Sequence, residues 1–298
     1  MNQNQKNNVF WFITLSIPFL LFLGVELALR IGGYEQEKQE LFVEAPNTPD
    51  YLIANSTFIE RYFPSFVPEI APNAFRKEKL PNTFRIFVFG GSSAEGFPYN
   101  FYTGFADQLE QQLLLNTQGL PIEVINLGMT AVNSYVIRDL SKRVLPYEPD
   151  AVIIYAGHNE YYGSFGAATT QFGFSNSIGL KRLILWLKDW RIYQFLENTL
   201  QIGGTNQDTG ERRTMMAKVI SESDIPVDSD IYRHGIQQYR SNMSSLVERF
   251  DNSGVPVFLG TVASNLKDQA PLSDNPEVLA LYEQAQATYE EGLVDEAF

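Results

Sequence analysis

The segment 84–96 reads FRIFVFGGSSAEG, and it joins a short β-rich run directly to a turn of two glycines and two serines. Three further apolar runs follow along the chain: VINL at 124–127, AVIIY at 151–155 and VPVFLGTV at 255–262. Stretches typical of helices lie between or before them, over 101–117, 132–145, 178–200 and 235–250. Continuous apolar strands that alternate with helices indicate a parallel sheet buried on both faces, and hence an α/β fold.

The residues that follow these strands are the candidates for chemistry, because ligand sites of such sheets lie beyond the carboxyl ends of the strands. Ser92 and Ser93 stand where the glycine turn enters a helix, a position whose outward N–H groups can stabilise an anionic intermediate. Either serine can instead cap the helix. Gly128 can offer its N–H to a substrate oxygen or form a tight turn. Asn159 can donate from its side-chain amide or act as a helix cap.

These blocks together resemble the SGNH hydrolases, also called the GDSL family of esterases and lipases. The matching pieces are GGSSAEG at 90–96, Gly128, and Asn159 within GHNEYYG. The resemblance extends over residues 83–270 and is greatest to a membrane-anchored bacterial subgroup whose hydrolase domain is joined to tetratricopeptide repeats. It implies a flavodoxin-like, three-layer α/β sandwich with a mostly parallel sheet.

The resemblance also implies a serine esterase that works through an acyl-enzyme, without a metal or an organic cofactor. Ser92 is the expected nucleophile, and its own N–H, the Gly128 N–H and the Asn159 amide are expected to hold the oxyanion. Four further residues are expected to line the substrate: Gly91, Ser93, His158 and Glu160.

The chain departs from the family pattern in two places. The aspartate that usually precedes the nucleophile is Gly91 here. The family's base is a histidine in an Asp-x-x-His block after the last strand, and no histidine follows Val262. His234 has Asp230 at the wrong spacing and precedes the last strand, so we expect a surface or helix-entry residue. The base is therefore expected beyond Phe298, and the 298-residue chain alone is expected to be nearly inactive.

Two other functions remain open besides ester hydrolysis. An O-acyltransferase acting on cell-surface polysaccharide would use the same site, with a sugar hydroxyl in place of water. A non-catalytic, repeat-linked scaffold would need no base. The substrate is expected to be an ester, with an acylated carbohydrate as one candidate. A net charge of −13 argues against a nucleic-acid partner, and the absence of cysteine excludes disulfides and thiolate chemistry.

The N-terminal region is apolar enough to cross a membrane. Residues 9–25 read VFWFITLSIPFLLFLGV, and only Glu26 interrupts the run before Arg30. A spanning helix needs about 20 residues. We expect a transmembrane signal anchor over 9–31 and a cytoplasmic tail over 1–8. The domain would then face the periplasm from a bacterial inner membrane. A cleaved signal peptide and a buried core helix are the alternatives.

Two segments flank the expected hydrolase domain. Residues 32–82 combine six prolines with many aromatics, which excludes long helices and suggests a juxtamembrane segment that packs on the domain. Residues 276–298 carry small residues and tyrosines at intervals close to a tetratricopeptide helix pair. A lone repeat cannot bury its own apolar face, so an incomplete repeat and a protein partner through such repeats are expected.

Overall fold

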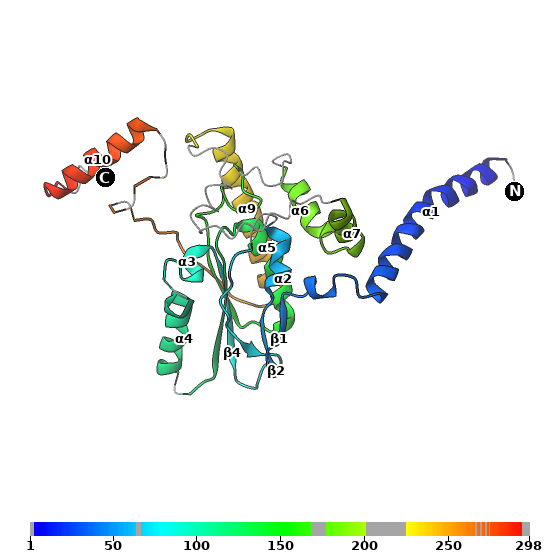
Figure 1. Cartoon of the computed structure of the whole chain (residues 1–298), viewed down its shortest axis with the longest axis horizontal. Helices are drawn as coiled ribbons and strands as arrows, with labels where there is room; N and C mark the ends of the chain where they lie inside the picture. The colour runs from blue at the N-terminus through cyan, green and yellow to red at the C-terminus, as the bar shows by residue number, and fades with distance from the viewer. Residues whose placement is uncertain are drawn as a thin grey trace.

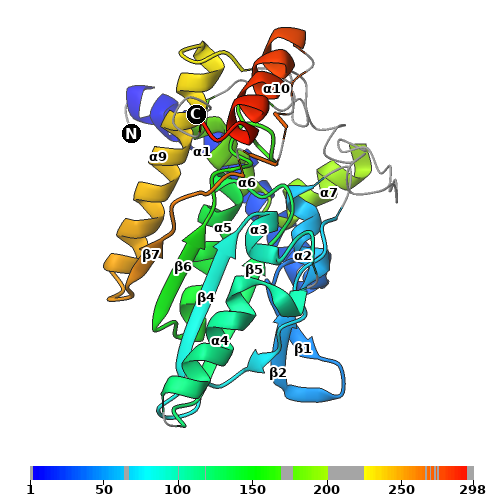
Figure 2. The same ribbon diagram turned by 90° about the vertical axis from the view of Figure 1, so that its left-hand side faces the viewer.

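A computed structural model describes residues 3–293, apart from 64–66, 100, 118, 169–176, 201–224, 266, 269, 272 and 274. The body of the molecule is built on a sheet of four parallel strands in the order β5-β4-β6-β7 (Figure 2). The strands are β4 (Phe84–Gly90), β5 (Ile122–Gly128), β6 (Ala151–Tyr155) and β7 (Val257–Leu259). Each overlaps one of the four predicted runs, so the prediction of a parallel sheet in an α/β fold is confirmed.

Helices cover both faces of this sheet. The covering helices are α4 (Phe105–Asn116) on one face, and α5 (Ser134–Val144) and α9 (Asp230–Asp251) on the other. Side chains alternate along a strand, so Ile86 and Val88 of β4 pack in the cluster with α4, whereas Phe87 and Phe89 pack with α5 and α9. The strand order reverses direction between β4 and β6, and a ligand crevice is expected at such a point.

The remaining helices are short or peripheral. They are α1 (Gln3–Ile31), α2 (Ser56–Ile59), α3 (Ser92–Glu95), α6 (Ile178–Leu187), α7 (Arg191–Leu200) and α10 (Pro276–Glu290), with 3-10 turns η1 (Gln36–Lys38), η2 (Glu60–Tyr62), η3 (Phe101–Thr103) and η4 (Leu145–Tyr147). The helical region predicted over 178–200 is therefore two helices joined by a short turn.

The segment 32–82 holds a second, antiparallel sheet that its proline content concealed in the sequence. Its strands are β1 (Phe42–Ala45), β2 (Thr48–Ala54) and β3 (Phe75–Arg76), in that spatial order. Phe42 and Phe75 both contact Phe87 of the central sheet, with ring centroids 6.1 and 5.9 Å apart. The small sheet is therefore joined to the core of the α/β body through aromatic packing.

The two ends of the chain project from the body (Figure 1). Within α1, Phe10–Ile31 is long and apolar enough to cross a membrane, and very little of it is buried. A signal sequence satisfies the same criteria. At the other end, α10 has no buried residue. The helix pair expected over 276–298 begins with α10, but residues 294–298 lie outside the described part of the chain, and no tetratricopeptide repeat is established.

Candidate active site

The carboxyl ends of three neighbouring strands lie at the same level. Gly90, the last residue of β4, pairs with Gly128 at the end of β5 and with Tyr155 at the end of β6. The loops that leave these strands therefore start side by side. Ser92 follows β4 and Asn159 follows β6, so the sheet brings together the segments that the sequence singled out.

Ser92 is the first residue of α3, and its side chain does not cap that helix. Gly91 occupies the N-cap position in an extended conformation, and its carbonyl accepts hydrogen bonds from the N–H groups of Ala94 and Glu95. Ser92 is half-buried and Ser93 is exposed. The Ser92 hydroxyl forms no hydrogen bond to any described residue.

Asn159 lies directly against the turn that carries Ser92. It is buried, and its amide nitrogen Nδ2 donates to the Val132 carbonyl over 3.1 Å. A Cβ atom added to Gly91 would come within 2.7 Å of that nitrogen. The absence of a side chain at Gly91 thus allows the amide to approach the residue before the serine. An aspartate at this position, as in the family pattern, would displace Asn159.

Gly128 supports α3, and its N–H already has an acceptor. A Cβ atom at Gly128 would lie 2.4 Å from the Glu95 backbone nitrogen, so only glycine lets α3 pack on β5. The Gly128 N–H donates to Asn126 Oδ1 over 2.9 Å. The Asn126 amide in turn donates to the Ala94 carbonyl over 2.8 Å. In this conformation, Gly128 fixes the site and does not present a free donor, unlike the oxyanion role expected of it.

Three residues beside the site were given no role in the sequence analysis. Asn126 is a buried polar residue inside the apolar run of β5, and that contrast was a usable signal. The Thr130 hydroxyl donates to Glu95 Oε2 over 2.6 Å, a contact without a sequence signature. Ala131 is buried with φ 61°, in the left-handed region that favours glycine. The loop of Thr130 and Ala131 thus takes a conformation that its amino-acid composition does not predict.

Within the described part of the chain, neither histidine forms a hydrogen bond with the Ser92 hydroxyl. His158 is exposed, and its Nε2 lies 3.1 Å from the Ala263 carbonyl, in the loop after β7. His234 lies in α9, near the start of that helix. The described residues contain no group of three or more His, Cys, Asp or Glu side chains that could hold a metal ion.

Glu160 is directed into the protein and does not line the surface beside Ser92. It is 4% exposed, and its carboxylate accepts hydrogen bonds from the Ser134 N–H and Ser134 hydroxyl over 3.1 and 2.7 Å. These contacts hold the first turn of α5. Burial raises the pKa of Glu160 to about 7, against the lowering effect of the Ser134 hydrogen bonds and of Lys181. The substrate-lining role expected of Glu160 is replaced by a structural one.

The raised pKa of Glu160 predicts a pH-dependent stability. The folded protein retains a proton that the unfolded chain releases near pH 4.5, so wild type loses stability as the pH rises from 4.5 to about 7. Glu160→Gln removes this titration. The unfolding free energy of Glu160→Gln, relative to that of wild type, should therefore rise by about 3 kcal/mol between pH 4.5 and about 7. Guanidinium unfolding in detergent at several pH values measures the difference, with exposed Glu248→Gln as control. A difference that does not change with pH would contradict the assignment.

Comparison with known proteins gives structural neighbours but no family match. No family model and no curated protein matches the chain. Solved structures similar to it include TesA, at 15% identity over 70% of this chain and 74% of that chain, with a TM-score of 0.32. The SGNH-hydrolase family esterase AlinE4 is 15% identical over 72% of this chain and 97% of that chain, with a TM-score of 0.32. The psychrotrophic esterase EstA from Pseudoalteromonas sp. is 18% identical over 72% of this chain and 99% of that chain, with a TM-score of 0.30. Values this low support no transfer of function, which must be argued from the residues of this chain.

Proposed function

We propose that this chain carries the nucleophile and the oxyanion site of a serine ester hydrolase of the SGNH type. One observation carries the proposal: Ser92 opens α3 half-buried, with a hydroxyl that no described residue engages, while the Asn159 amide lies against the residue immediately before it. A hydroxyl, a helix N-terminus and a buried amide donor in one place are the parts that acyl transfer requires.

The proposed reaction proceeds in two steps. Ser92 Oγ attacks the ester carbonyl, a base takes the hydroxyl proton, and the C–O bond to the alcohol breaks as that proton passes to the leaving alcohol. Water then attacks the acyl-enzyme, the acid is released, and the proton returns to Ser92. In both steps the negative charge on the carbonyl oxygen is held by the Ser92 N–H and the Asn159 amide. The Gly128 N–H would join them only if it left Asn126.

The base is not supplied by a residue that contacts Ser92 in the described structure. The family resemblance implies that a histidine of an Asp-x-x-His segment fills this role. Without a base the serine is a weak nucleophile, so the 298-residue chain alone should show little hydrolysis. Activity is therefore to be measured on the complete gene product, with the 298-residue chain in parallel.

Asn159→Ala tests the oxyanion site. Loss of one preorganised donor should lower kcat for p-nitrophenyl acetate by about 10²–10³-fold and leave KM nearly unchanged, because the donor acts on charge that develops in the transition state. Asn116→Ala, an exposed change on α4, serves as the control. Thermal unfolding of both variants separates misfolding from loss of the donor. A folded Asn159→Ala variant with the wild-type kcat would contradict the proposed site.

An O-acyltransferase is the second candidate, because exposed aromatic side chains follow Ser92 closely. Phe97, Tyr99 and Tyr102 are all exposed large side chains. Aromatic faces of this kind suit the apolar faces of sugar rings, and a sugar hydroxyl would then replace water as the acyl acceptor. Product analysis with an acyl donor and an oligosaccharide distinguishes the two functions. An acylated sugar formed in preference to the free acid identifies the transferase.

We further propose that α1 anchors the domain to a bacterial inner membrane, with the domain on the periplasmic side. Support comes from the apolar length of Phe10–Ile31 and from its exposure, because a core helix of that length would be buried. Extraction of the expressed protein from membranes by detergent, and not by carbonate, is the expected behaviour of an uncleaved anchor.

A further inference from the structure

The segment made of α6, the turn of residues 188–190 and α7 is called the hairpin below, and its turn and α7 pack on the domain-side end of α1. The ring centroids of Phe22 and Trp190 lie 5.4 Å apart. Glu26, the one charge within the apolar run, is only 4% exposed and accepts hydrogen bonds from the N–H groups of Arg191 and Ile192 over 3.2 and 2.9 Å. These N–H groups begin α7, so the carboxylate caps a helix N-terminus, where negative charge is favoured.

The contacts continue beyond the end of α1. The Arg191 guanidinium donates to the Glu35 carbonyl over 2.7 Å, and the Asn198 amide donates to Tyr34 and to Glu35. Tyr34 and Phe195 make an edge-on ring contact at 5.8 Å. The hairpin therefore lies alongside the last turns of α1 and the residues that follow. Phe22 precedes Ile31 by roughly 14 Å of helix rise, so these contacts begin within the span itself.

In the hairpin, the charged side chains face the protein and large apolar side chains face outward, which is the reverse of a usual amphipathic surface helix. Every charged side chain in residues 177–200 is buried or half-buried and has a protein partner: Lys181, Arg182, Lys188, Asp189, Arg191 and Glu197. Five large apolar side chains point outward instead and are between 41 and 61% exposed: Leu183, Trp186, Phe195, Leu196 and Leu200. We call these five residues the outer face. In water such an arrangement is costly, because it leaves apolar surface unburied.

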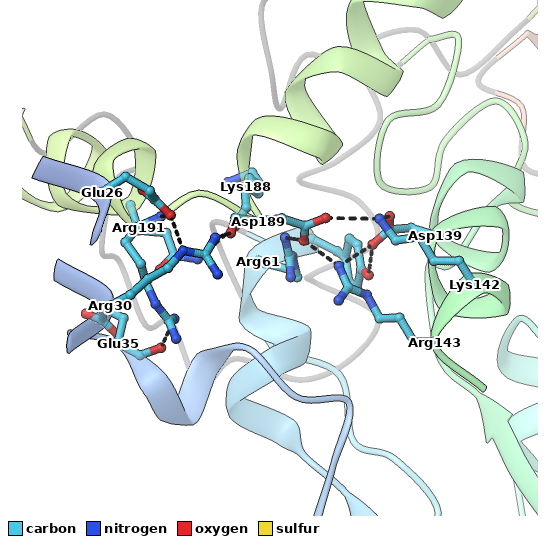
Figure 3. A network of polar contacts seen from close by, with 12 residues as sticks. Glu26, Arg30, Glu35, Arg61, Asp139, Lys142, Arg143, Lys188, Asp189 and Arg191 are labelled. Carbon is cyan, nitrogen blue, oxygen red and sulfur yellow. Dashed lines mark hydrogen bonds and ion pairs between the residues drawn. The ribbon is translucent and has the colours of Figure 1, made fainter. Parts of the chain in front are cut away.

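A salt-bridge cluster holds the hairpin firmly to the domain (Figure 3). Asp189, in the turn between α6 and α7, binds Arg61 of η2 over 2.6 Å and Arg143 of α5 over 2.5 Å. Lys142 contacts Asp189 over 3.1 Å and Asp139 over 2.6 Å. The outer face is thus fixed both to the spanning helix and to α5, whose first turn adjoins the candidate active site.

We propose that the outer face is seated in the headgroup region of the lipid leaflet from which α1 emerges. The proposal rests on the membrane anchoring proposed above. The occupant is lipid because α7, which carries three residues of the outer face, packs on α1, whose own apolar side chains are exposed. In addition, tryptophan and apolar side chains with inward charges suit the membrane interface. The hairpin and α1 then form one membrane-bound unit that sets the orientation of the α/β domain.

Tryptophan quenching in vesicles tests this placement, since the sequence contains three tryptophans, Trp11, Trp186 and Trp190. The full chain is reconstituted in phosphatidylethanolamine and phosphatidylglycerol vesicles, with bromine placed on the acyl chains near the headgroups. One double variant, W11F/W190F, leaves Trp186 alone; the other, W186F/W190F, leaves Trp11 alone. Trp186 should be quenched by the brominated lipid and protected several-fold from aqueous acrylamide.

The outcomes separate the hairpin from the anchor. If Trp11 is quenched by lipid while Trp186 is open to acrylamide, the hairpin proposal fails and the anchor stands. If neither is quenched by lipid, both proposals fail. If Trp186 is protected from both quenchers, protein such as a second copy covers the outer face, and the lipid assignment is overturned.

A charge placed on the outer face provides an independent check. In the chain that retains only Trp186, Leu196→Glu should reduce lipid quenching several-fold and shift the emission to longer wavelength, because a carboxylate resists entry into lipid. Leu115→Glu, on exposed α4 at the opposite face of the sheet, is the matched control and should change nothing. Unchanged quenching in the Leu196→Glu chain would contradict the proposal.

Discussion

Ser92→Ala should abolish the hydrolysis of p-nitrophenyl acetate by the complete gene product, with kcat falling by roughly 10⁴-fold or more. The methyl group of alanine keeps the shape of the turn but cannot form the acyl-enzyme. Because the Ser92 side chain caps no helix and forms no hydrogen bond to a described residue, its removal should leave stability nearly unchanged. A loss of activity without a loss of folding is the expected result.

Ser93→Ala is the matched control for this substitution. Ser93 is the next residue of the same short helix, is more exposed than Ser92, and is expected to line the substrate but not to form the acyl-enzyme. Its substitution should therefore lower kcat by severalfold at most. Equal rates for Ser92→Ala and wild type would remove Ser92 as the nucleophile. A complete gene product with no hydrolytic or transfer activity at all would favour the non-catalytic scaffold.

Asp189→Asn should lower the free energy of unfolding by about 2 kcal/mol, less than the loss for a fully buried ion pair because the Asp189 side chain is 29% exposed. Asp189 and Asp139 together balance Arg61, Lys142 and Arg143 (Figure 3). With one carboxylate neutralised, three cations would share a single anion, and the side chains of Arg61 and Arg143 are largely buried. Guanidinium unfolding in detergent measures the loss.

The control for this variant is Asp230→Asn. Asp230 also pairs with an arginine, but its side chain is 98% exposed, and exposed pairs contribute little. Its unfolding free energy should match that of wild type. Equal stability of Asp189→Asn and wild type would show that the hairpin is not held by this cluster.

Acid should weaken the same salt-bridge cluster in the wild-type protein and so lower its free energy of unfolding. Arg61, Arg143 and Lys142 overcome the effect of burial and hold the pKa of Asp189 down at about 2, below its usual 3.8. The contribution of Asp189 to stability is therefore complete above pH 3.8 and disappears as the pH falls towards 2. Asp189→Asn lacks this contribution at every pH, so the two unfolding curves should converge in acid.

The strands and the loops of the site were predictable from the sequence because local patterns encode them. Apolar runs that end in glycine mark the strands of a buried parallel sheet, and the strand ends place Ser92 and Asn159 near each other. The antiparallel sheet of 42–76 was not predicted, because the prolines of this segment favour irregular structure and its aromatic partner Phe87 lies in another part of the sequence.

Partners distant in sequence explain what the pattern missed. Glu160 follows a strand, as a substrate-lining residue would, yet its carboxylate meets Ser134, a residue that only the fold brings near. Gly128 has the position of an oxyanion donor, but Asn126 accepts its N–H. Glu26 looked like an interruption of an apolar helix until Arg191 and Ile192 supplied its partners. In each case the sequence showed a residue of a suitable type, but it did not show which distant residue that side chain or N–H group would contact.

The most direct measurement for the central claim is the identity of the residue that a fluorophosphonate reagent modifies in the complete gene product. Such reagents phosphonylate the serine that an esterase activates, and peptide mass spectrometry locates the adduct. We expect an adduct on Ser92 that is absent from Ser92→Ala. An adduct on Ser93 or on any other residue, or hydrolysis that continues while Ser92 stays unmodified, would contradict it.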